Sequence, residues 1–354
     1  MFAVTQLAEW TEDVTARLLG TVDDLEPDEL TVPYMPTINP PVWEVCHAVY
    51  FLEYWVLRDL LGQPPFRADY DAIFDSMTVG HESRWRLRVP DVAGARAYLE
   101  DVRDRVLAAL GADHRDELLP YRVAYSVFHG DMHVEAIAYC RQALGLSNAD
   151  VRAREPTART EDASGDASIG GGVFELGARD DGSFCFDNEK WAHPVELDPF
   201  AIARTAVTEG QFAAFVDDEA YTRRELWSPR GWRWLQSVQV ELPLYWRRGA
   251  SGFERRVFDE WAPIAPSRAM MHVNWYEADA YCRWAGRRLP SEAEWELAAA
   301  TPEKRPLPWG DEPATAQRAN FDGAYGGAID AAALAGGDSA TGVRQMLGNV
   351  WEWT

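Results

Sequence analysis

Apolar residues recur through the first 150 positions with the period of an α-helix. Leu7, Val14 and Leu18 fall on one face of a helix near the N-terminus. The proline-rich segment TVPYMPTINPP predicts a turn, after which a second helix begins near Pro41 and ends at Gly62.

Two further helices are predicted over residues 92–110 and 122–144, and Gly145 ends the second of them. Four helices of this length favour an up-and-down bundle, in which inward-facing side chains can form a metal site. The pattern therefore predicts an all-α first domain over residues 1–150.

The pattern changes after residue 150. Residues 151–172 are small, polar and glycine-rich, which is typical of a flexible linker or loop. Over 173–354, short apolar runs are separated by Gly, Pro and Asp, and helices are predicted over 208–220, 275–286 and 291–300. Ser291 and Glu294 predict a capping box for the last of these. The second domain is thus predicted to be an irregular α+β domain.

Composition limits the classes of partner. The chain has 354 residues and a formal net charge of −23, which disfavours binding to nucleic acid or to an anionic membrane surface. No apolar run approaches the roughly 20 residues of a membrane span, and the N-terminus lacks a signal-peptide pattern. The four cysteines are far apart and suit a reducing compartment. We expect a cytoplasmic protein, and the oligomeric state stays open.

Three histidines are the strongest candidates for chemistry. His129 and His133 are four residues apart, so they share one face of the predicted fourth helix. His47 lies in the predicted second helix. If these helices pack together, three neutral imidazoles can hold one divalent metal and leave coordination positions open, as a catalytic metal requires. Taken singly, His47 is more typical of a satisfied core histidine, and the pair His129/His133 is more often a chance or surface arrangement.

Other polar residues near these histidines in the sequence, or elsewhere in the chain, are candidates for supporting or binding roles. Asp131 and Glu135 lie off the histidine face, which favours a supporting or surface role over metal binding. The segment DSMTVGHESRWRLRVP contains Arg84 and Arg86, which are either a solvated basic loop or a clamp for a carboxylate-bearing substrate. The segments GRRLPSEAEWE and MLGNVWEWT allow a purely structural interpretation. Their tryptophans would pack a loop-rich core, and Asn349 would bond backbone in a turn.

The same segments carry a family resemblance. The second domain resembles the formylglycine-generating-enzyme/sulfatase-modifying-factor fold, a variant of the C-type lectin architecture, in VTEGQFAAFV, HVNWYEADAYCRWAGRRLPSEAEWELAA, PWGDE and GNVWEW. The first domain resembles the DinB-like four-helix bundle in PPVWEVCHAVYFLEYWVLRD and HGDMHVEA. In this order the two domains resemble the EgtB-like, ergothioneine-type sulfoxide synthases.

That resemblance implies an Fe(II) enzyme that uses O2 to couple a thiol to the imidazole carbon of hercynine. It implies that the iron ligands are His47, His129 and His133, and that Arg84 and Arg86 grip the carboxylates of the thiol. The segments DSMTVGHESRWRL and FDNEKWAHPVEL look more like the selenoneine-synthase branch, whose donor is a selenosugar. Trp351 and Trp353 suit a trimethylammonium group through cation–π contact, and we add Asn349 to these substrate-binding candidates.

The chain also departs from the family pattern. Related chains often carry Glu and Gln where this one has Gly130 and Met132, so contacts to hercynine are expected to differ. Family members continue for several tens of residues beyond the position of Thr354, and that stretch supplies an active-site tyrosine. We therefore expect the second domain to be C-terminally incomplete and assign no catalytic proton donor.

Two other functions remain open on the sequence. One is a zinc-dependent DinB-like thiol S-transferase that uses the same three histidines without O2. The other is a non-catalytic binding protein with a degenerate site. Formylglycine generation is disfavoured, because it relies on a cysteine pair late in the domain, and only Cys185 and Cys282 follow the predicted linker.

Overall fold

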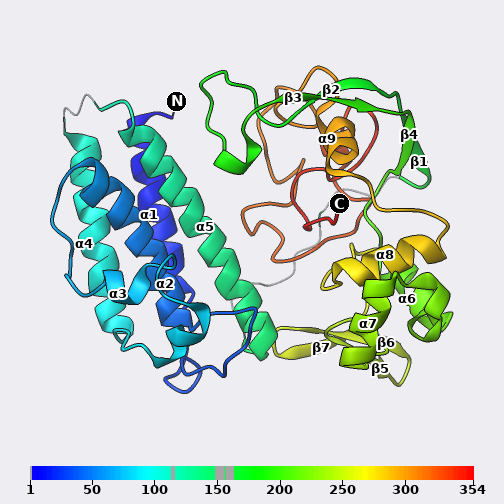
Figure 1. Cartoon of the computed structure of the whole chain (residues 1–354), viewed down its shortest axis with the longest axis horizontal. Helices are drawn as coiled ribbons and strands as arrows, with labels where there is room; N and C mark the ends of the chain where they lie inside the picture. Colours follow the sequence, from blue (N-terminus) through cyan, green and yellow to red (C-terminus); the bar gives the residue numbers. More distant parts are fainter. Residues whose placement is uncertain (1, 113–115, 148–155, 157–162) are drawn as a thin grey trace. The chain divides into compact units, whose positions relative to one another are not determined.

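The chain divides into two compact units. The computed structural model describes residues 2–112, 116–147, 156 and 163–354 (Figure 1). By contacts, one unit comprises residues 1–148 with 181–186, and the other comprises 149–180 with 187–354. Much of the predicted linker, 151–172, lies outside the described residues. Its later part is not loop throughout, because residues 166–169 form a strand.

Residues 181–186 pack in the first unit, although their sequence position places them in the predicted second domain. Phe184 contacts Phe128 with ring centroids 4.8 Å apart, and Phe186 contacts Tyr125 at 5.9 Å. This aromatic contact between segments far apart in the sequence explains why periodicity and composition did not assign these residues to the bundle.

In its described residues, the first unit is a bundle of four long helices, as predicted. They are α1 (Val4–Gly20), α2 (Pro41–Leu52), α4 (Val92–Gly111) and α5 (Leu119–Leu144). The bundle is not a simple up-and-down arrangement. Helices α1 and α2 each pack against α4 and α5, but they contact each other only sparsely. Helices α1 and α2 are therefore diagonal neighbours in the bundle, and the long proline-rich connection after α1 spans the distance between them. This arrangement places α2 directly beside α5.

The second helix changes geometry after Leu52 while it stays packed in the bundle core. From Glu53 to Leu60 it is a π-helix, after which Gly62 takes a left-handed φ of 63°. The Glu53 side chain is fully buried and accepts hydrogen bonds from the Phe66 amide and from the Tyr98 hydroxyl. Beyond it come a short helix, α3 (Asp71–Phe74), and a 3₁₀ segment over His81–Arg86 in place of the expected loop.

Helix α5 approaches α1 closely at one glycine. A Cβ atom on Gly130 would lie 2.7 Å from Cγ2 of Val14, which is itself buried. The glycine therefore lets two helix backbones meet at the position between His129 and His133. Gly145 ends the helix in the left-handed conformation, as predicted. In the described part of the chain, no helix is long and apolar enough to cross a membrane.

The second unit combines small antiparallel sheets with short helices, which confirms its α+β class. Strand β1 (Asp166–Ile169) pairs with β4 (Phe200–Ala203), and β2 (Gly172–Leu176) pairs with β3 (His193–Leu197). A third sheet has the order β5 (Trp246–Gly249), β6 (Gly252–Val257), β7 (Glu260–Pro263).

Four helices complete the described part of this unit. They are α6 (Glu209–Asp217), α7 (Pro229–Val238), α8 (Trp275–Trp284) and α9 (Glu292–Ala300). The predicted capping box is confirmed, since Ser291 accepts from the Glu294 amide and the Glu294 side chain bonds back to the Ser291 amide. Helix α7 was not predicted.

Candidate metal centre

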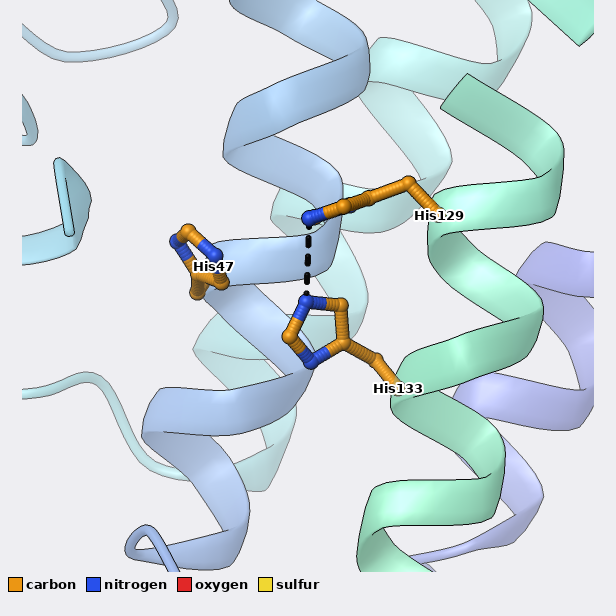
Figure 2. A group of neighbouring side chains, drawn as sticks. All are labelled: His47, His129 and His133. Atoms are coloured by element: carbon orange, nitrogen blue, oxygen red, sulfur yellow. Dashed lines mark hydrogen bonds between the residues drawn. The ribbon is translucent and has the colours of Figure 1, made fainter. Parts of the chain in front are cut away.

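The three predicted histidines converge inside the first unit. His47 comes from α2, and His129 and His133 come from successive turns of α5 (Figure 2). One ring nitrogen from each lies within 4.8 Å of the others. The Nε2 atoms of His129 and His133 are 3.1 Å apart. The packing of α2 against α5 therefore assembles the triad that the sequence could only suggest.

Hydrogen bonds at Nδ1 orient two of the rings. Nδ1 of His47 lies 2.7 Å from the carbonyl oxygen of Phe74, and Nδ1 of His133 lies 2.6 Å from Oε1 of Glu44. Both partners can only accept, so each Nδ1 carries the proton and each Nε2 keeps its lone pair. This is the tautomer in which Nε2 can bind a metal.

The third ring is held by stacking. The Phe51 ring lies against the His129 ring, with centroids 3.9 Å apart and an interplanar angle of 17°. Nδ1 of His129 is buried and has no hydrogen-bond partner in the described chain. Its Nε2 atom faces Nε2 of His133, whose lone pair is already directed there. Either His129 leaves a buried acceptor unsatisfied, or two lone pairs face each other.

A metal ion bound by both Nε2 lone pairs would replace the repulsion between them with attraction. Two nitrogens bound to one ion at about 2.1 Å and at right angles lie roughly 3.0 Å apart, close to the 3.1 Å between His129 and His133. Burial, with the neighbouring His133 ring, lowers the pKa of His47 to about 4 and of His129 to about 2. Both rings are therefore neutral near pH 7, and neutral imidazoles suit Zn, Fe, Cu or Ni. The residues present fit a metal centre.

An arginine lies behind the His47 side of the centre. The Trp43 ring stacks on His47 with centroids 4.9 Å apart and an interplanar angle of 8°, and the Arg84 guanidinium lies 4.0 Å from the Trp43 ring centroid. Arg84 also donates to Oδ1 of Asn39 at 2.7 Å. The Trp43 ring thus lies between Arg84 and His47 of the triad. Arg86 is exposed on the same 3₁₀ segment. Their roles with substrate stay predictions.

The flanking residues on α5 point elsewhere. Asp131 pairs with Arg17 of α1 at 2.5 Å, which supports α1–α5 packing. Met132 is exposed, and Gly130 serves the close helix approach described above. The difference from related chains at Gly130 therefore has a packing explanation.

The substrate candidates of the second unit lie near residue 354. Asn349 accepts hydrogen bonds from the Ile329 amide (2.9 Å) and from Asn320 (3.0 Å), so it bonds backbone as predicted, but of a distant segment instead of its own turn. Trp353 donates to the carbonyl of Val273 at 3.0 Å, and Trp351 is 87% exposed. Contact of these side chains with a substrate stays a prediction.

Sequence reasoning missed Glu44, Phe51 and Phe74 as supports of the triad. Glu44 precedes His47 by three residues and Phe51 follows it by four, so helical spacing places both near His47. That spacing does not show that each of them supports a histidine on the other helix. No comparable signal exists for Phe74, because it acts through its backbone carbonyl.

Comparison with known proteins agrees with this architecture. Residues 11–139 match the DinB superfamily, and residues 152–354 match the sulfatase-modifying factor enzyme 1-like domain. A hercynine oxygenase from Mycobacterium tuberculosis is 35% identical, over 100% of this chain and 84% of its own. The chain belongs to the hercynine oxygenase family. This confirms the EgtB-like superfamily predicted from the sequence motifs.

Two other relatives show how far each domain is shared. A hercynine oxygenase from Mycolicibacterium smegmatis is 33% identical, over 100% of this chain and 83% of its own. A formylglycine-generating enzyme from Thermomonospora curvata is 34% identical, but it covers only 58% of this chain and 74% of its own. Similarity over both domains therefore distinguishes the hercynine oxygenases from the formylglycine-generating enzymes.

Proposed function

We propose that this protein is a non-haem Fe(II) oxidoreductase of ergothioneine-type biosynthesis, which uses O2 to join a thiol or selenol donor to the imidazole carbon of hercynine. The observation that carries the proposal is the histidine triad on α2 and α5, in a chain of the hercynine oxygenase family. Three neutral imidazoles leave coordination positions free, which suits an oxygen-using metal.

The residues around the triad would prepare this chemistry. An Fe(II) ion there would supply redox chemistry with O2 and would acidify a thiol or selenol. The Phe74 carbonyl keeps the Nδ1 proton on His47, and Phe51 fixes the plane of His129. Both contacts hold the histidine rings in one orientation before a metal binds, so the rings need to reorganise little on binding.

Substrate recognition is the finer part of the proposal. We assign the carboxylates of the chalcogen donor to Arg84 and Arg86, since arginine pairs with carboxylates through two parallel hydrogen bonds. Trp351 and Trp353 suit the trimethylammonium group of hercynine through cation–π contact. The selenosugar donor of the selenoneine branch is one candidate donor beside cysteine and γ-glutamylcysteine.

Oxygen consumption tests the proposed function. Anaerobically Fe(II)-loaded protein is expected to consume O2 only when hercynine and a donor are both present, and His133→Ala is expected to abolish this. The Mycolicibacterium smegmatis hercynine oxygenase serves as the positive control. Absence of hercynine-dependent O2 uptake with every donor, while the control is active, would overturn the proposal.

The same triad also suits zinc, so a zinc-dependent thiol S-transferase is the rival activity. Metal analysis of the purified protein and thiol transfer under argon separate the two. Transfer that proceeds without O2 on the zinc form would replace the iron proposal.

A further inference from the structure

Glu44 is a buried carboxylate with only one of its oxygens satisfied. It lies on α2, one turn before His47, and is 4% exposed. Oε1 accepts the Nδ1 proton of His133 at 2.6 Å. Oε2 is buried and has no hydrogen-bond partner in the described residues. Burying a carboxylate in this way is unfavourable unless a positive charge lies nearby.

Arg84 attracts Glu44 electrostatically but forms no hydrogen bond with Oε2 of Glu44. Its guanidinium stacks on Trp43 and donates to Asn39. His133 supplies a neutral N–H donor when its Nε2 lone pair is free. A metal bound to the triad would add a second positive charge close to Glu44, through His133.

We propose that Glu44 is a positioning residue of the metal centre, which orients His133 through Nδ1 and raises cation affinity through its negative charge. This inference rests on the proposed function only in requiring that a metal binds the triad. The contrast with His47 is informative, since its Nδ1 is held by the neutral carbonyl of Phe74. One ligand thus has an anionic support and another a neutral one, and the anionic support makes His133 the stronger donor.

Two substitutions separate the hydrogen bond from the charge. Glu44→Gln keeps a side-chain oxygen that can accept from His133 but removes the charge, and Glu44→Ala removes both. Glu53→Gln is the matched control, because Glu53 continues the same helix and is fully buried but bonds Phe66 and Tyr98 instead of a histidine.

The experiment is a Co(II) titration of the whole chain, followed by visible absorption. We expect Glu44→Gln to weaken Co(II) binding roughly 10- to 100-fold and Glu44→Ala to weaken it at least as much, as is usual when a ligand's supporting group is lost. Glu53→Gln is expected to bind like the wild type. The absorption bands of the cobalt form should also shift in the Glu44 variants, because the donor strength of His133 changes.

Thermal melting provides the second readout. Without metal, Glu44→Gln is expected to melt no lower than the wild type, since an unsatisfied buried charge is removed. With saturating Co(II), its melting temperature should rise less than that of the wild type. A purely structural role for Glu44 would lower stability equally with and without metal.

The outcomes distinguish this inference from the proposed function. Wild-type affinity and spectrum in folded Glu44→Gln would overturn the inference alone, as would an equal loss in Glu53→Gln. Absence of Co(II) binding by the wild type would instead remove the metal centre on which both rest.

Discussion

The Phe51 ring on α2 lies flat against the imidazole of His129 on α5, with centroids 3.9 Å apart. His47 and His133 are each held by a hydrogen bond at Nδ1, whereas Nδ1 of His129 has no such partner among the described residues. Stacking across the helix interface therefore stands in for the missing hydrogen bond, and it fixes the ring plane but not the position of the proton.

Replacing Phe51 with Leu should weaken metal binding moderately. The aromatic pair is worth about 0.5–1.5 kcal/mol and is already formed without metal, so its loss should raise the dissociation constant by no more than roughly 2- to 13-fold. Phe66→Leu is the control, because the Phe66 ring packs on Tyr98 and Tyr70 of the same unit, with centroids 5.0 and 6.0 Å away, and has no ring contact with a histidine among the described residues. Calorimetric titration with Co(II) measures the effect, and an equal loss in both variants would refute the assignment.

Removal of either α5 ligand should abolish stabilisation by metal. Wild-type protein at a metal concentration about 100 times the dissociation constant gains about 2.7 kcal/mol of unfolding free energy, and a chelator reverses this gain. His129→Ala and His133→Ala are expected to show no metal-dependent shift in melting temperature. His193→Ala, at an exposed strand position, should behave like the wild type. A metal-dependent shift retained in both α5 variants would place the metal elsewhere.

Gly130→Ala should destabilise the chain, although alanine is favoured over glycine inside a helix by about 1 kcal/mol. The added Cβ meets the buried, conformationally stiff Val14, and such overpacking costs about 1–3 kcal/mol. In a Val14→Ala background the same substitution should become neutral or stabilising. Urea unfolding of the four chains of this cycle measures the coupling, and additive effects would contradict the close approach.

The capping box of α9 predicts an acid-dependent loss of stability. Glu294 accepts two hydrogen bonds from Arg288, and this pairing, with the Ser291 amide, lowers the pKa of Glu294 to about 2. A lowered carboxyl pKa stabilises the folded state above pH 4.5, and this stabilisation is lost as the pH falls from 4.5 towards 2.

Unfolding free energies measured in urea between pH 5 and pH 2.5 test this. The wild type should lose more stability over this window than Glu294→Gln, in which the group cannot titrate. Glu292→Gln, exposed on the same helical turn, is expected to follow the wild type. Parallel curves for the wild type and Glu294→Gln would show that the pair contributes nothing.

Local signals predicted most of the helices and the two-domain division. Periodicity located the bundle helices, and Gly145 and Ser291 marked a helix end and a helix start. Three features depend on tertiary contacts, and the sequence did not predict them. They are the packing of residues 181–186 against the bundle, the diagonal placement of α1 and α2, and the residues that support the triad. Helix α7 was overlooked, although Ser228 caps it and Pro229 occupies its first turn.

The π-helical segment from Glu53 to Leu60 has a consequence for comparing chains of this family. A π-helix accommodates an extra residue in a helix without unfolding it. Homologues that are regular here should therefore align with a one-residue gap inside the helix, after the first iron-ligand candidate, His47. An ungapped alignment across this segment would match Trp55 and the residues after it to the wrong residues of such a homologue.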